Sequence, residues 1–128
     1  MGKYGEAAVK AVKLLVSGNV DRPKDAWEVA TSEIFSKGTS SQRKGCPRNA
    51  FLGLCEEGKI KGIPPGNYTN SRKNKEYAIK AVQILQEIPA LSSNPETLWN
   101  RVVERAYKAH NQQMDVVTQL WNNNLIVV

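Results

Sequence analysis

The fold is decided by the stretch PRNAFLGLCEEG, which runs from Pro47 to Gly58. Proline is favoured in the first turn of a helix and glycine just beyond its end, so this stretch predicts one short helix. A helix that is apolar on most sides belongs in the centre of a domain, so we expect the other helices to pack around it. Its apolar residues are Phe51, Leu52, Leu54 and Cys55.

On both sides of this helix, apolar residues recur at every third or fourth position, which is the spacing of amphipathic helices. Capping and breaking residues stand where such helices should begin and end. We expect four further helices: from Tyr4 to Leu15, ended by Gly18; from an Asp21 cap to Ile34; from an Asn70 or Ser71 cap to Ile88, ended by Pro89; and from an Asn94 cap to Trp121.

The last of these helices keeps its apolar spacing without a break, so it would have about 27 residues and a length of about 40 Å. A kink near Asn111 is the alternative. Ile60 and Ile63 fit a short extended segment, and the apolar tail Leu125–Val128 should dock on the domain, with a short strand as one form. The sequence therefore predicts one compact all-α domain over residues 1–128, with about five helices, a long C-terminal helix and at most a short β segment.

Composition excludes several classes of protein. The chain has 128 residues, of which 41% are hydrophobic and 23% charged, as is usual for a globular domain. Its longest aliphatic run has four residues, and charged residues interrupt the first sixteen, so we expect neither a membrane span nor a signal peptide. The chain has two cysteines, and without an export signal this favours the cytoplasm.

The net charge of +6 comes entirely from the middle of the chain. The segment between Lys37 and Lys75 contains nine cations but only two anions, Glu56 and Glu57. Such a patch favours phosphates or other acidic partners, although a solvated surface that keeps the protein soluble is the alternative. The nine cations are Lys37, Arg43, Lys44, Arg48, Lys59, Lys61, Arg72, Lys73 and Lys75.

Two predicted helix starts within this segment carry the wrong charge. Helix N-termini have a partial positive charge and usually attract Asp or Glu, and each misplaced cation costs a few tenths of a kcal/mol. We therefore expect these helix starts to bind an anion that is not part of the chain. Phosphate is an anion that helix N-termini typically bind. Arg43, Lys44 and Arg48 surround the first start, and Arg72, Lys73 and Lys75 the second.

Two segments in this region also carry a family resemblance. SSQRKGCPRNAFLGLC (Ser40–Cys55) and GIPPGNYT (Gly62–Thr69) resemble the central block of a family of small prokaryotic proteins with a domain of unknown function. The opening GKYGEAA (Gly2–Ala8) and the late HNQQMDVV (His110–Val117) are similar to the same family. The resemblance covers nearly the whole chain and implies a single intact domain. It assigns no activity, ligand or catalytic residue to this chain.

Cys46 is the candidate for a reactive thiol. It stands at the expected cap of the central helix, and helix starts and nearby cations such as Arg43 and Arg48 favour a thiolate. The alternative is a structural cap before a helix-starting proline, and no histidine lies near in the sequence to act as a base. A catalytic role is therefore the less favoured interpretation.

Other catalytic and metal sites have little support. His110 is the only histidine, and it stands on an apolar stripe, which favours a hydrogen-bonded core imidazole. The two cysteines lack metal-ligand spacing, so we expect neither a metal nor a cofactor. Glu56 and Glu57 are consecutive, diverge on a helix and should be a solvated pair near its end.

These observations favour a small helical module that binds the phosphates of nucleic acid. The central helix and the loop that contains Lys59 and Lys61 would face the phosphate backbone. One alternative is a non-catalytic interaction module for an acidic partner, or a homo-oligomer formed by the tail and the last helix. The other is an enzyme or binder for a phosphorylated small molecule that uses Cys46 or His110. Neutral hydrogen bonds to phosphate or sugar would come from Ser40, Ser41, Asn67, Tyr68 and Thr69.

Overall fold

The computed structural model describes residues 2–104, 109, 110 and 112–128, and the elements that it describes are all helices, as predicted. No helix in these ranges combines the length and the apolar character that crossing a bilayer requires. The helices are α1 (Lys3–Val16), α2 (Pro23–Phe35), α3 (Ser40–Arg43), α4 (Gly45–Glu56), α5 (Arg72–Glu87), the 3-10 helix η1 (Pro89–Ser93), α6 (Pro95–Val103) and α7 (Gln113–Asn122).

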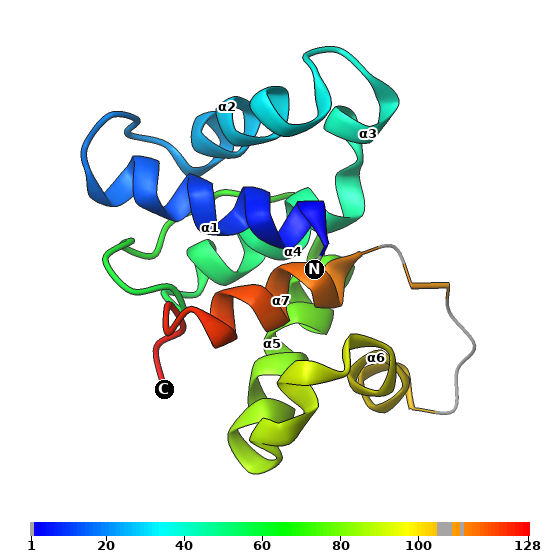
Figure 1. The fold of residues 1–128 in the computed structure, drawn as a ribbon. Helices are drawn as coiled ribbons and strands as arrows, with labels where there is room; N and C mark the ends of the chain where they lie inside the picture. Colours follow the sequence, from blue (N-terminus) through cyan, green and yellow to red (C-terminus); the bar gives the residue numbers. More distant parts are fainter. Residues whose placement is uncertain (1, 105–108, 111) are drawn as a thin grey trace.

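The predicted central helix is α4, which begins two residues before Pro47. It packs against α2, α5 and α7, and α1 lies against both α2 and α7 (Figure 1). The one aromatic side chain of α4 faces α2: the rings of Phe51 and Trp27 stack with their centroids 5.3 Å apart. The prediction of a buried central helix is therefore confirmed, although α7, which packs against α1, α4, α5, α6 and η1, shares the central position.

Two close helix contacts depend on glycine. A Cβ atom at Gly53 of α4 would lie 2.7 Å from the Cα of Lys75 in α5. At Gly5 of α1, a Cβ atom would lie 2.6 Å from the carbonyl oxygen of Asp115 in α7. The buried carboxylate of Asp115 in turn accepts a hydrogen bond from the Gly5 N–H at 2.8 Å. Any larger residue at either position would force the two helices apart.

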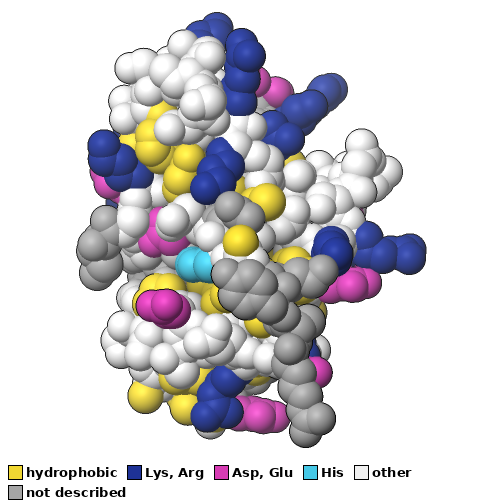
Figure 2. Space-filling view, turned by 90° about the vertical axis from the view of Figure 1, so that its right-hand side faces the viewer, with side chains coloured by type: hydrophobic (Ala, Val, Ile, Leu, Met, Phe, Trp, Pro, Cys, Tyr) yellow, Lys and Arg dark blue, Asp and Glu magenta, His cyan; other side chains and the backbone are white. Residues whose placement is uncertain are grey.

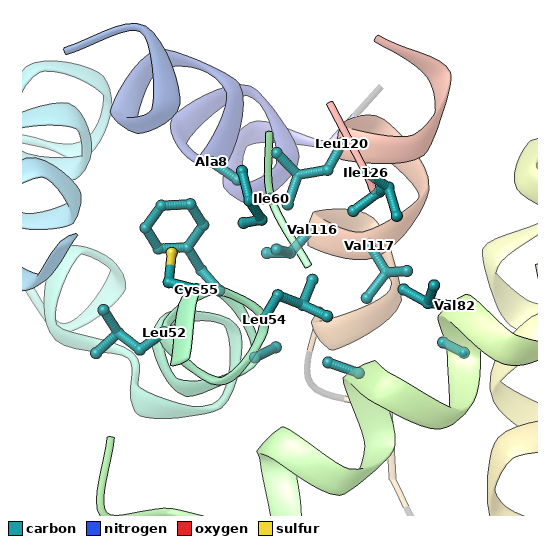
Figure 3. Packing of buried hydrophobic residues seen from close by; sticks show 14 of the residues in the cluster. Ala8, Leu52, Leu54, Cys55, Ile60, Val82, Val116, Val117, Leu120 and Ile126 are labelled. Atoms are coloured by element: carbon teal, nitrogen blue, oxygen red, sulfur yellow. The ribbon is translucent and has the colours of Figure 1, made fainter. Parts of the chain in front are cut away.

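The apolar tail docks, as predicted. Ile126 is 3% exposed and forms an isolated antiparallel β-bridge with Ile60. Figure 3 shows both side chains in the buried cluster, next to Leu54 of α4 and Leu120 of α7. Hydrogen bonds flank the bridge, from Lys61 N to Leu125 O at 2.9 Å and from Val127 N to Lys59 O at 2.8 Å.

The prediction of one long C-terminal helix is wrong. The structure has α6 and α7 in place of the unbroken helix, and the two pack against each other. Glu104, which follows α6, and Gln112, which precedes α7, both have positive φ angles, of 56° and 71°. A helix cannot continue through such a conformation, although the apolar spacing on either side is helical. The possible kink at Asn111 lies outside the described residues.

The caps were predicted with mixed success. Ser71 and Asn94 do accept hydrogen bonds from the first turns of α5 and α6. Asp21 is not the cap of α2, because the helix begins at Pro23 and Arg22 takes the cap position without a side-chain bond. The polar stretch between α2 and α4 contains the short helix α3, which Thr39 caps.

Candidate functional site

Lys75, one of the predicted anion-binding cations, has two carboxylate partners within the chain. Its ammonium group contacts Glu56 and lies 2.6 Å from Glu57 Oε1. The expectation that these glutamates diverge into solvent is wrong, because α4 ends at Glu56 and Glu57 is already the C-cap. For Lys75, the chain itself therefore supplies the anion that we expected from outside.

Glu56 also anchors the loop that precedes α5. Its Oε1 atom accepts hydrogen bonds from Tyr68 N at 2.8 Å and from Thr69 N at 3.2 Å. The hydrogen bond from Lys75, together with these two backbone N–H groups, lowers the pKa of Glu56 to about 2. The carboxylate therefore stays charged near neutral pH and fixes the loop to the end of α4.

The anchored loop forms one wall of a polar hollow of about 370 Å³. The hydroxyl of Thr69 donates to Asn49 Oδ1 of α4 at 2.8 Å and accepts from Ser71 N at 3.1 Å. Lys24 of α2 and Arg48 of α4 line the hollow, and none of the described residues that line it is acidic. This is a cationic surface with fixed hydroxyl and amide groups.

A second hollow, of about 170 Å³, lies beside the first, because Lys24 and Arg48 line both. Its wall adds Trp27, Glu28, Gln42 and Arg43. We call the two hollows together the basic groove. None of its three cations forms an ion pair with a residue that the structure describes. The groove therefore has cations without internal partners and one carboxylate, that of Glu28.

The structure does not bring the nine central cations together. Lys44 turns towards α1, where its Nζ atom lies 5.8 Å from the centre of the Tyr4 ring. Lys59 and Lys61 follow the far end of α4, which at 1.5 Å per residue is about 18 Å from its start. Lys61 there donates to Asn124 at 3.0 Å. Basic side chains on the face in Figure 2 are likewise spread singly, with acidic ones among them.

The remaining predicted cations lie near carboxylates or alone. Arg72 lines a hollow of about 570 Å³ together with Glu56, Glu57 and Glu76. Lys37 lines another hollow, which also includes three acidic residues, Asp25, Glu28 and Glu33. Lys73 is exposed at the second position of α5. Of the predicted anion-binding cations, Arg43 and Arg48 alone line the basic groove, together with Tyr68 and Thr69 of the predicted neutral groups.

Lys24 is the groove residue that the sequence reasoning missed. It stands in the first turn of α2, outside the segment with the charge excess, and Asp21 and Asp25 balance it in the sequence. The signal was present in a weaker form, since α2 also has a cation in its first turn, although Asp25 stands beside it. Only the packing of α2 on α4 shows that this cation lies beside Arg48.

The match to known families extends the resemblance over the whole domain. Residues 1–127 match the family of unknown function DUF6979. The chain belongs to this family. It matches no curated protein and no protein of solved structure.

In this DUF6979 chain, Cys46 is not the helix cap. Lys44 takes the cap position and Cys46 is the second residue of α4, so the predicted capping role is wrong. The Cys46 side chain is half-buried. Cys55 is fully buried, and burial raises the pKa of its thiol well above the usual range. Cys46 therefore remains the more accessible of the two thiols.

His110 is hydrogen-bonded, as predicted, but it is half-buried rather than in the core. Its Nε2 atom accepts from Met114 N at 3.1 Å, which satisfies one N–H group at the start of α7. The centroids of the His110 and Trp99 rings lie 5.3 Å apart. Burial lowers the pKa of the imidazole. This neutral acceptor has a structural role at the start of α7.

Proposed function

We propose that this protein binds the phosphate groups of nucleic acid through the basic groove. The observation that carries the proposal is the set of three cations, Lys24, Arg43 and Arg48, around two neighbouring hollows. None of them has an ion-pair partner among the residues described. Arginine and lysine side chains without internal counterions are the groups that neutralise phosphates and release bound cations from nucleic acid.

Neutral groups at the groove support the same proposal. Thr69 and Ser71 present hydroxyl groups beside Arg48, and Glu56 holds the backbone of their loop in place. Hydroxyls, amides and backbone N–H groups supply many of the phosphate contacts in protein–nucleic acid complexes. A groove built in this way would bind the backbone and would not by itself read the base sequence.

The test is the affinity for labelled DNA and RNA oligonucleotides, measured by fluorescence anisotropy as a function of salt. If the three groove cations meet phosphates, they contribute about −2.7 to the slope of log K against log salt on duplex DNA. Reversing the charge of Lys24, Arg43 and Arg48 to Glu should weaken binding by at least a hundredfold at low salt and flatten this slope.

The matched control reverses Lys13, Lys59 and Lys61 to Glu. This triple variant lowers the net charge by the same amount but changes residues that line neither hollow of the groove. We expect a loss of less than tenfold. Equal losses in the two variants would mean that binding reflects total charge alone, and no binding of the unmodified protein at low salt would exclude the proposed function.

A phosphorylated small molecule is the second candidate ligand, because the two hollows have the volume of a small ligand, about 370 and 170 Å³. A thermal-shift screen of nucleotides and sugar phosphates distinguishes the candidates. Stabilisation by one such compound at concentrations where oligonucleotides have no effect would favour the small molecule.

A further inference from the structure

The larger hollow of the basic groove has an aromatic side chain in its wall as well as cations. Of the described residues that line this hollow, Tyr68 alone is aromatic, and Lys24 and Arg48 line it too. Tyr68 is partly exposed, whereas Trp27 of the smaller hollow is only 1% exposed and has no ring face open to a ligand. Tyr68 is therefore the aromatic residue of the groove that a ligand can contact.

The Tyr68 side chain is held in position by its own loop. Its backbone N–H donates to Glu56 Oε1 at 2.8 Å, and its hydroxyl donates to the carbonyl oxygen of Pro64 at 2.9 Å. Gly66 lies against the tip of the ring, since a Cβ atom there would be 2.6 Å from Tyr68 Cζ. Because these contacts already order the ring, a ligand that packs on it loses little affinity to side-chain ordering.

An aromatic ring beside cations distinguishes two forms of nucleic acid. In a duplex the bases are paired and stacked on one another, so a base can lie on a protein ring only after it has left the stack. A single strand presents base faces as well as phosphates. Proteins that bind single strands without sequence preference combine a positively charged groove with aromatic side chains on which bases stack.

The size of the hollow agrees with a single strand. A volume of about 370 Å³ corresponds to roughly twelve water molecules at about 30 Å³ each. This is room for one nucleotide, whereas a duplex could only lie across the opening. The phosphates of a duplex would then reach the cations at the rim, but its bases would not reach Tyr68.

We propose that the basic groove binds single-stranded nucleic acid, with one base stacked on the ring of Tyr68 and the adjoining phosphates at Lys24 and Arg48. The inference rests on the proposed function and deepens it, since it names the form of nucleic acid that the groove takes. Every base has a π-face, so stacking of this kind tolerates any sequence. DNA and RNA strands share this chemistry, and the test includes both.

The test measures the affinity of the whole protein for labelled oligonucleotides of one length by fluorescence anisotropy at equal salt. The probes are single-stranded DNA, single-stranded RNA, the DNA duplex and a single strand whose sugars carry no bases. Charge alone favours the duplex, which has the higher charge density and the steeper salt dependence. We nevertheless expect the intact single strands to bind about tenfold more tightly than the duplex, and at least fivefold more tightly than the abasic strand.

Two variants locate the effect at the ring. Tyr68→Leu removes the ring and should weaken single-strand binding at least fivefold, while the duplex affinity stays within about twofold. Tyr68→Phe is the matched control, because it keeps the ring and loses only the hydrogen bond to Pro64, and its single-strand affinity should stay within about twofold. Since Tyr68 packs against the core, thermal unfolding checks the fold of Tyr68→Leu. If that variant does not fold, the abasic strand tests stacking on the unmodified protein.

The outcomes separate the inference from the proposed function. Equal affinities for the intact and the abasic strand overturn the inference, and so does an unchanged single-strand affinity in Tyr68→Leu or an equal loss in Tyr68→Phe. In each of these cases the proposed function stands if reversing the three groove cations still weakens binding. No binding of any oligonucleotide to the unmodified protein excludes the proposed function and the inference together.

Discussion

The starts of α4 and α5 both carry cations, which repel the partial positive charge of a helix N-terminus. The two starts differ in whether residues of the chain neutralise these cations. At α5, Lys75 is paired with Glu56 and Glu57, and Arg72 lies in a hollow with the same glutamates. At α4, Arg43 and Arg48 have no ion-pair partner among the described residues. A basic helix start is therefore not evidence for a ligand until the counterions within the chain have been found.

The largest loss of stability at the contact between α4 and α5 should come from Gly53→Ala. The new methyl group would meet the Cα of Lys75 at 2.7 Å, which is backbone and cannot move without shifting α5. Overpacking of this kind costs about 1–3 kcal/mol, and we expect a value near the upper end in urea denaturation. Gly45→Ala is the control, because its methyl group would meet nothing closer than an Arg48 nitrogen at 3.5 Å. Equal losses in the two variants would contradict the close contact.

Replacing Lys75 with Met should cost about 2 kcal/mol of unfolding free energy, because hydrogen bonds to charged groups contribute about 1.5–3 kcal/mol. Lys73→Met removes the same charge from an exposed position of the same helix and should change stability by less than about 0.5 kcal/mol. Both variants should bind oligonucleotides equally well. A weaker affinity in Lys75→Met alone would show that Lys75 contacts the ligand despite its internal partners.

Low pH should destabilise the contact between α4 and α5, because the carboxylate of Glu56 becomes protonated. Its carboxyl titrates near 4.5 when unfolded and at about 2 in the folded protein. Between these values the unfolded chain binds more protons, so the contribution of Glu56 is complete above pH 4.5 and is lost as the pH falls towards 2. Glu56→Gln should be less stable than the unmodified protein at pH 7, by about 1–2 kcal/mol. The difference should shrink in denaturation curves recorded towards pH 3, and a constant difference would contradict the assigned pKa.

The smallest expected effects concern the two thiols of α4, Cys46 near its start and Cys55 near its end. Alkylation followed by peptide mapping should modify Cys46 before Cys55, because Cys55 is buried and burial raises the pKa of its thiol. Cys46→Ser should change stability by less than about 0.5 kcal/mol, since Cys46 is not the helix cap. Faster modification of Cys55 would mean that the end of α4 opens more readily than its start.

Local patterns in the sequence predicted most of the helices, and long-range contacts account for what was missed. Ser71 and Asn94 cap the first turns of their own helices, so their roles are visible in the sequence. The ion pair of Glu56 with Lys75 spans 19 positions, and its existence depends on how α4 meets α5. The end of α6 at Val103 was missed because a positive φ angle at Glu104 leaves no signal in apolar spacing.

The same distinction applies to the candidate site. Arg43 and Arg48 were identified because they cluster in the sequence, whereas Lys24 joins them only through helix packing.

The pairing of Gly5 with Asp115 has a consequence for how the chain matures on the ribosome. Synthesis proceeds from the N-terminus, and the first helices emerge before the segments that cover them. α1 can meet α2 early, but its second neighbour, α7, is made more than 100 residues after Gly5. During elongation one apolar flank of α1 therefore remains uncovered. The core can be completed only after α7 and Ile126 have been synthesised, because both follow all the other described helices in the sequence.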